Sequence, residues 1–243
     1  MDAFLDDDDA IHSSNGTGGV TLSAVHIDNP EGDGWDAPNL VGVNLIDNNT
    51  LIENINTSNT HAVNVTNTNT NLTSLTVENS TFEDQPAANG ATYFDFDLRG
   101  TSNMTSTGTM NTTIQRNAFR NAQGTLGENG VSVASAWQAR QNAIVDNNIV
   151  INVSKGVATS SAIGSTVTGS SIMDAEWTNN DIDTIPNQGG ISLAGEQDGA
   201  GAGLIDVQIN DNVIDGVGDK SISVTAFDLC PDMDVEFSAT TSA

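Results

Sequence analysis

The chain has 243 residues, and its 32 acidic residues against 6 Lys or Arg give a formal net charge of −26 at pH 7. This length suffices for one large domain or two small ones with a sizeable core. The charge argues against nucleic acid and anionic membrane surfaces as partners, because both would repel the chain.

The sequence has no apolar run of the roughly eighteen residues that a membrane helix needs, so we expect no membrane insertion. The first ten residues, MDAFLDDDDA, do not have the pattern of a signal peptide. An acidic composition is typical of proteins in salty water, where salt screens like charges, so we expect an extracellular or cell-surface location. The lone cysteine, Cys230, excludes an internal disulfide.

The first forty residues predict the beginning of a repeat. GGVTLSAVHI at 18–27 alternates like a strand and fits a partial first winding. DNPEGDGWDAPN at 28–39 is rich in turn residues and predicts a loop, from which we expect Trp35 to fold back over the end of the core.

From residue 41 a short pattern recurs with a period near thirty-one residues, which is typical of solenoids. Each copy has a polar anchor: Thr50 (or its neighbour Asn49), Ser80, Asn117, Asn148, Asn180 and Asn212. Two places after each anchor the residue is apolar: Ile52, Phe82, Phe119, Val150, Ile182 and Ile214. The first copy fits only if one extra residue enters near IDNNTLI at 46–52, which predicts a local bulge.

Two further strands are predicted in each repeat, since alternating segments rich in β-branched residues are typical of half-buried strands. One set reads HAVNV at 61–65, GVSV at 130–133, GISL at 190–193 and SISV at 221–224. The other set includes LTSLTVENS at 72–80 and LIDVQINDN at 204–212. No segment has a helical period.

Stacking explains why the pattern repeats. One winding cannot bury its apolar side chains, but stacked windings bring equivalent residues together at about 4.8 Å. Aliphatic residues then form columns inside. Asn residues form columns at the corners, where they adopt left-handed angles at low cost and bond to the next winding. A β-sandwich is the alternative, but it does not predict six aligned apolar positions.

The segments NDIDTI at 180–185, NVIDGV at 212–217, NIVINV at 148–153 and NAFRNA at 117–122 resemble the repeats of right-handed parallel β-helix proteins, a family that includes pectate lyases, tailspikes and bacterial adhesins. The resemblance covers roughly 41–230. It implies an all-β, right-handed parallel β-helix solenoid of about six coils, with three short strands per coil. It implies little about function, because one fold carries many functions.

We therefore divide the chain into a partial first coil and loop at 1–40, repeats at 41–230, and a continuation of the last coil or a tail at 231–243. Neither end has a pattern typical of a capping helix. Because an open β-helix end exposes unpaired backbone groups, we expect the ends to bind further copies of the chain or neighbouring subunits. We also expect the native protein to continue beyond this chain.

The segment YFDFDLRG at 93–100 is the strongest candidate for chemistry. As a strand it places Tyr93, Asp95, Asp97 and Arg99 on one face. In an enzyme that cleaves polysaccharides, the two carboxyl groups could act as acid and base beside Arg99, and Tyr93 could stack on sugar. In the alternative interpretation, Arg99 only neutralises two acidic neighbours on a solvated face.

Calcium is the candidate cofactor, and no other cofactor is indicated. Asp183 and Asp215 occupy the same repeat position, so stacked windings would hold two like charges that a cation would relieve. DDDD at 6–9 lacks the spaced ligands of a calcium loop. The histidines are widely separated in sequence, which favours ordinary surface roles: His12, His26 and His61.

The sequence favours a structural or adhesive module of a secreted or surface protein, able to assemble end to end into filaments. A polysaccharide lyase or glycoside hydrolase that uses Asp95, Asp97 and Arg99 is the alternative. Calcium-dependent binding of glycans without catalysis lies between the two.

Overall fold

The computed structural model describes residues 9–14, 18–54, 61–67, 70–83, 92–98, 108–120, 129–136, 139–152, 155–163, 171–183, 190–197, 204–216, 221–226, 232–238 and 241–242. Throughout these ranges the regular secondary structure consists of β-strands, without a helix. The described ranges accordingly contain no helix that could cross a membrane.

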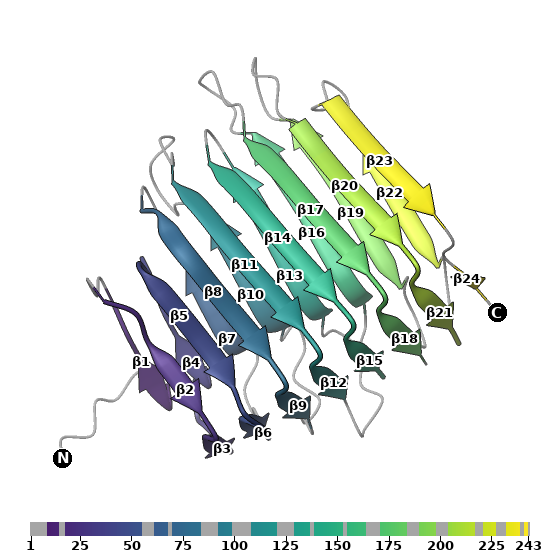
Figure 1. The fold of residues 1–243 in the computed structure, drawn as a ribbon. Coiled ribbons are helices and arrows are strands. Elements are labelled where there is room, and N and C mark those ends of the chain that lie inside the picture. The colour runs from purple at the N-terminus through teal and green to yellow at the C-terminus, as the bar shows by residue number, and fades with distance from the viewer. Residues whose placement is uncertain are drawn as a thin grey trace, which may run out of the picture.

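The strands form three parallel sheets of eight strands each, which run side by side along the molecule (Figure 1). Sheet A contains β1 (Ile11–His12), β4 (Trp35–Asp36), β7 (His61–Thr66), β10 (Thr92–Leu98), β13 (Asn129–Ala136), β16 (Lys155–Ile163), β19 (Ile191–Gln197) and β22 (Ile222–Ala226). Sheet B contains β2 (Thr21–Ser23), β5 (Val43–Asp47), β8 (Leu72–Glu78), β11 (Thr109–Gln115), β14 (Arg140–Asp146), β17 (Ile172–Thr178), β20 (Leu204–Asn210) and β23 (Asp232–Ser238). Sheet C contains β3 (His26–Asp28), β6 (Leu51–Glu53), β9 (Thr81–Glu83), β12 (Ala118–Arg120), β15 (Ile149–Ile151), β18 (Asp181–Asp183), β21 (Val213–Asp215) and β24 (Thr241–Ser242).

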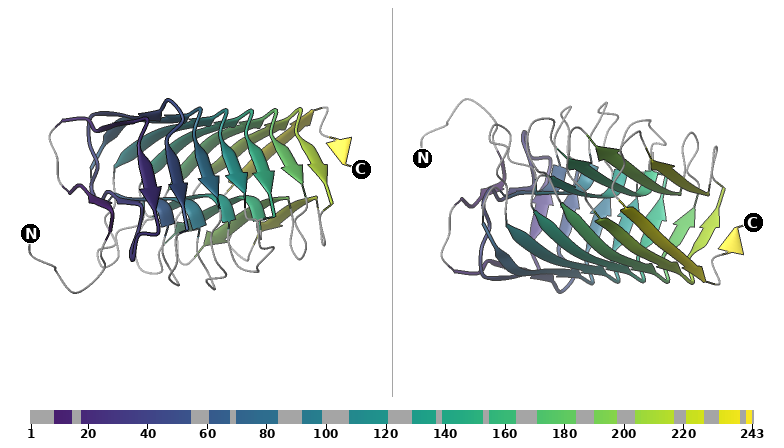
Figure 2. Two further views of the ribbon diagram at one scale, coloured as in Figure 1. Left: turned by 90° about the horizontal axis from the view of Figure 1, so that it is seen from below. Right: turned by 90° about the horizontal axis from the view of Figure 1, so that it is seen from above.

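The chain visits sheets A, B and C in turn, and each strand pairs with the strand three further along (Figure 2). One such circuit is a winding. The predicted all-β parallel solenoid with three short strands per winding is therefore confirmed. The sheets also extend to both sides of the repeat region at 41–230, since β1 to β4 precede it and β23 and β24 follow it.

The predicted apolar column lies inside the solenoid. Ile182 and Ile214 are register partners, and neither side chain is exposed. The column runs from β3 to β21 of sheet C through buried residues: Ile27, Ile52, Phe82, Phe119, Val150, Ile182 and Ile214. The rings of Phe82 and Phe119 stack with centroids 5.4 Å apart and planes inclined by 16°. Each fully buried side chain of this size stabilises the fold by about 1.5–3 kcal/mol relative to exposure.

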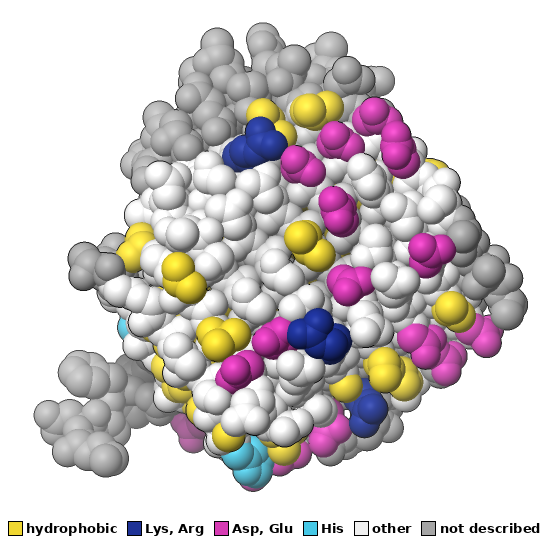
Figure 3. Space-filling view, viewed as in Figure 1, with side chains coloured by type: hydrophobic (Ala, Val, Ile, Leu, Met, Phe, Trp, Pro, Cys, Tyr) yellow, Lys and Arg dark blue, Asp and Glu magenta, His cyan; other side chains and the backbone are white. Residues whose placement is uncertain are grey.

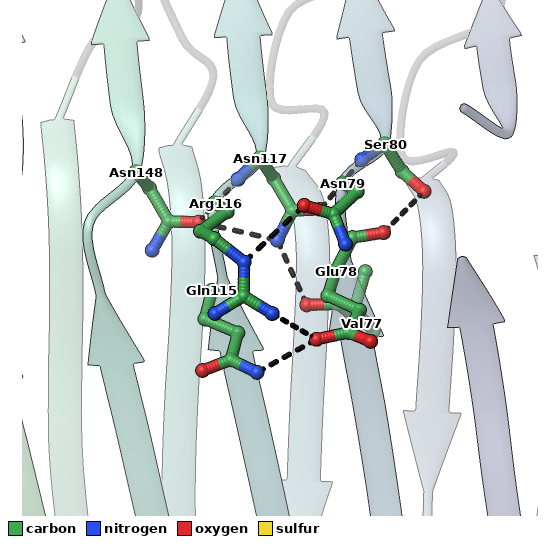
Figure 4. A network of polar contacts seen from close by, with 8 residues as sticks. All are labelled: Val77, Glu78, Asn79, Ser80, Gln115, Arg116, Asn117 and Asn148. Atoms are coloured by element: carbon green, nitrogen blue, oxygen red, sulfur yellow. Dashed lines mark hydrogen bonds and ion pairs between the residues drawn. The ribbon is translucent and has the colours of Figure 1, made fainter. Parts of the chain in front are cut away.

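The polar anchors form a ladder of buried hydrogen bonds between sheets B and C (Figure 4). Asn117 donates its backbone N–H to Asn148 Oδ1 over 3.0 Å, and Asn148 donates in the same way to Asn180 Oδ1 over 3.1 Å. The side-chain amide of Asn180 donates to the Val145 carbonyl of the previous winding and to Asn212 Oδ1, at 2.8 and 2.9 Å. Each Asn therefore ties its own corner to the windings on both sides.

The residue before each of the last five anchors turns the chain with a positive φ, between 49° and 56°: Asn79, Arg116, Asn147, Asn179 and Asp211. Asn and Asp tolerate these angles more readily than other non-glycine residues do. Arg116 is the one residue of these five that is neither Asn nor Asp. Its guanidinium bonds Glu78 and Asn79 of the previous winding, and these contacts offset the backbone cost (Figure 4).

Two local expectations need correction. The extra residue near 46–52 enlarges the corner rather than bulging a strand, because Asn48 and Asn49 both have φ of 59°. The pairing continues on either side, where Ile46 faces Val77. The expected loop at 28–39 contains β4, and Trp35 is a fully buried strand residue whose indole donates to Ser13 Oγ over 2.8 Å.

Substitution of Asn180 by Ala is expected to lower the free energy of unfolding by about 2–4 kcal/mol, because it leaves buried donors of Asn148 and the Val145 carbonyl without partners. Urea denaturation measures the loss. Asn48→Gly is the control, since Asn48 is exposed and Gly accepts its positive φ. A loss for Asn180→Ala no larger than that of the control would contradict a structural role for the ladder.

Candidate functional site

Two carboxylates and a histidine converge on the outer face of sheet A, at its N-terminal end. His12 in β1 and Asp36 in β4 are register partners. His12 Nδ1 lies 2.9 Å from Asp36 Oδ2 and 3.5 Å from Asp9 Oδ2. One ligand atom from each residue lies within 4.8 Å of the other two, so the set could hold a metal ion. We call Asp9, His12 and Asp36 the Asp-His-Asp cluster.

Hydrogen bonds from outside the cluster orient both carboxylates. Asp9 Oδ1 accepts the backbone N–H of Asp33 over 2.8 Å. Asp36 Oδ1 accepts the side-chain amide of Asn64, in β7, over 3.1 Å. In each carboxylate one oxygen is therefore held by a protein donor, and the other lies toward His12.

A second acid–histidine pair adjoins the cluster. Asp33 Oδ1 accepts the backbone N–H of His61 over 2.6 Å and lies 3.2 Å from His61 Nδ1. Asp33 and His61 are both largely buried, with side-chain exposures of 10% and 17%. The two groups of residues together connect the first three strands of sheet A.

Burial and like charge raise the pKa values of the two carboxyl groups in the cluster. Burial is the main cause of the raised pKa of Asp9, and the charge of Asp33 adds to it, while the Asp33 N–H bond and His12 oppose it. Burial also raises the pKa of Asp36, followed by the charges of Asp9 and Asp33, with His12 again opposing. The fold therefore disfavours the charged forms of both groups when no cation compensates them.

Asp95 and Asp97, two of the residues predicted for catalysis, belong to β10, of which the structure describes the backbone. Asp95 pairs with Asn64, and Asn64 pairs with Asp36, so Asp95 belongs to the same register column as the cluster. The side chains of Tyr93, Asp95 and Asp97, and the whole of Arg99, lie outside the described residues. Their catalytic arrangement stays a prediction.

The two aspartates predicted to hold calcium are register partners in β18 and β21. Asp215 is exposed, and its Oδ1 accepts the N–H of Gly216 over 2.6 Å, while Asp183 is half-buried. The backbone register thus stacks the two positions as the repeat predicts. Binding of calcium there stays a prediction.

The outer face of sheet B carries a shallow groove and a group of acidic side chains (Figure 3). The groove has a volume of about 240 Å³, and its lining includes Asn111, Asn142 and Asp174. The carboxylate of Asp174 forms an ion pair with the guanidinium of Arg140 at 3.1 Å. Asp174 is also in register with Asp206. Asp206 is in turn in register with Asp234, so carboxylates lie on three successive strands.

The C-terminal edge of the solenoid exposes apolar side chains whose register partners in the previous winding are fully buried. Phe237 in β23 is 53% exposed, although it lies in register with Ile209, which is fully buried. Val224 in β22 is 45% exposed, and its partner Leu193 is fully buried. Within the described residues, no strand pairs with the outer side of β22, β23 or β24.

The histidines have acidic partners that sequence reasoning missed. A fixed period near thirty-one residues does not bring His12 to Asp36, because the first winding spans only the 24 residues from Ile11 to Trp35. The next spans the 28 residues from Trp35 to Val63. In the sequence, β4 is marked only by an apolar residue followed by an acidic one, Trp35–Asp36, after a stretch rich in turn residues.

Comparison with known proteins finds no match: no family model, no curated protein and no solved structure resembles this chain closely enough to assign it.

Lowering the pH from neutrality is expected to stabilise the N-terminal windings in metal-free buffer. A carboxyl group whose folded pKa is raised takes up a proton more readily in the fold. Above its folded pKa, such a carboxyl group is charged and destabilises the fold. This destabilisation diminishes as the pH falls through the folded pKa and is gone below the ordinary carboxyl pKa of 3.8. Amide hydrogen exchange in β1 and β4, corrected for intrinsic rates, measures the change.

Asp36→Asn provides the matched variant for this titration. It removes one of the two shifted groups while keeping an acceptor for Asn64, so the gain at low pH should shrink markedly. An equal gain in the variant and the parent chain would show that general relief of the net negative charge, rather than the cluster, controls this end.

Proposed function

We propose that the chain is a structural and adhesive module of a secreted or cell-surface protein, and that its solenoid assembles end to end with further copies. The observation that carries the proposal is the C-terminal edge, where Phe237 ends a buried column with half of its surface exposed. An exposed strand edge with apolar side chains favours pairing with another strand.

The opposite edge of a second copy offers the matching residues. The column that ends at Phe237 begins at Leu22 in β2, and the column that ends at Ile222 begins at Ile11 in β1. If β23 of one copy paired with β2 of the next, Phe237 would lie over Leu22 and the column would continue. Contacts of this head-to-tail type generate open filaments rather than closed rings.

Charge sets the condition for this assembly. With a net charge of −26, two copies repel one another at low ionic strength. Salt at about 0.15 M reduces the screening length to about 8 Å, so that apolar contact and backbone pairing outweigh the repulsion at short range. The adhesive part of the proposal is supported by the resemblance of the repeats to β-helical adhesins. The polysaccharide-cleaving alternative depends on side chains of β10 outside the described residues.

Assembly is expected to grow with protein concentration and with salt, and Phe237→Asp is expected to abolish it. The variant places a charge in the apolar contact and leaves the buried windings unchanged. Sedimentation velocity measures the size distribution, and electron microscopy measures rod length.

Ile144→Asp is the matched control, because Ile144 is also apolar and 41% exposed but lies on the side of the solenoid. It should assemble as the parent chain does. A parent chain that stays monomeric at all concentrations and salt levels would contradict the proposal, as would equal effects of the two variants.

A further inference from the structure

We propose that Asp9, His12 and Asp36 bind one divalent transition-metal ion, such as zinc, and that this ion joins the first two windings. The site uses side chains on the outer face of sheet A, whereas the end-to-end assembly uses the free backbone edge of β1 and of its neighbours.

Two of the three separations between the donor atoms are close to those of a metal site. Ligand atoms that bind a zinc ion at about 2.0–2.2 Å lie roughly 3.0–3.6 Å apart at octahedral or tetrahedral angles. The distances from His12 Nδ1 to Asp36 Oδ2 and Asp9 Oδ2 are 2.9 and 3.5 Å. All three donor atoms lie within 4.8 Å of one another, so modest side-chain rotations would bring them to one ion.

The surroundings hold the ligands as the outer shell of a metal site does. The N–H of Asp33 and the amide of Asn64 each bond one oxygen of a carboxylate and leave the other oxygen toward His12. Hydrogen bonds of this kind fix ligand orientation, and their loss typically reduces metal affinity by about 10–100-fold. Neither donor belongs to the cluster itself, so the convergence of the three ligands is imposed by the fold.

The choice of ion follows from the ligand types. Imidazole nitrogen favours zinc and its neighbours among the transition metals, whereas calcium and magnesium favour sites made of oxygen alone. The His12 side chain is 52% exposed, so an ion can enter from solvent and keep water as a further ligand. A cation would also compensate carboxylates that are largely buried, with exposures of 13% and 20%.

Binding would strengthen the end of the solenoid where backbone pairing is sparsest. The strands β1 and β4 have two residues each, while β8 and β11 in the middle have seven. An ion held by Asp9 and His12 from one winding and by Asp36 from the next would cross-link them. Asn64 would extend the connection to β7.

The test is isothermal titration of the full chain with zinc chloride. The parent chain should bind one zinc ion saturably. His12→Gln and Asp36→Asn should each weaken binding by about tenfold or more, since each removes a direct ligand. His26→Gln is the matched control, because His26 is an exposed histidine of the same winding that pairs with Glu53 at 2.7 Å; it should bind like the parent.

Two further readings make the result decisive. The imidazole nitrogen resonances of His12 should shift on addition of zinc while those of His26 stay in place, and amide exchange in β1 and β4 should slow. Calcium chloride added in place of zinc should leave the His12 resonances unchanged. The proposal is overturned if zinc does not bind saturably, if His12→Gln binds as tightly as the parent while remaining folded, or if His26→Gln weakens binding as much as His12→Gln does.

Discussion

The parallel register of the backbone is the constraint on which every other feature depends. Apart from a register shift between Met110 and Thr112 in β11, the described strands face the equivalent strand of the next winding residue by residue, as Val150, Ile182 and Ile214 do in sheet C. A single apolar position per winding therefore becomes a continuous column, and a single amide becomes the ladder from Asn117 to Asn212. The ladder in turn satisfies buried donors and carbonyls at a corner where strand pairing cannot reach.

The same register has an electrostatic consequence. Equivalent residues stack on themselves, so an acidic position repeated along the chain becomes a row of like charges, as at Asp174, Asp206 and Asp234. Two of the basic residues pair with acids of neighbouring windings, Arg116 with Glu78 and Arg140 with Asp174. Uncharged Asn, Thr and Ser occupy many other outer positions and keep such rows short. Salt and bound cations would therefore reduce the repulsion between these carboxylates and between two copies of the chain.

The fold could be predicted from sequence because residues of the same chemical type recur at equivalent positions of each repeat. The polar anchors and the apolar residues two places later required only counting, and the structure places them on the predicted corner and inside sheet C. The Asp-His-Asp cluster could not be predicted in this way. Its ligands meet through a winding of 24 residues, shorter than the repeat, in which the pairing of β1 with β4 aligns His12 with Asp36. Likewise, an exposed Phe237 follows from its place in the last winding, not from its residue type.

Disulfide formation between the stacked positions 183 and 215 tests the in-register stacking of the windings most directly. Cysteines introduced by Asp183→Cys and Asp215→Cys, with Cys230→Ser to remove the native thiol, would lie on adjacent parallel strands, at about the 4.4–6.8 Å Cα separation that a disulfide requires. In-register stacking predicts that this pair forms an intramolecular disulfide rapidly under mild oxidation. The control pair Asp183→Cys with Asp206→Cys should form none, because its two strands belong to different sheets. Failure of the first pair to cross-link in the folded chain, or equal cross-linking of both pairs, would contradict the in-register stacking of the windings.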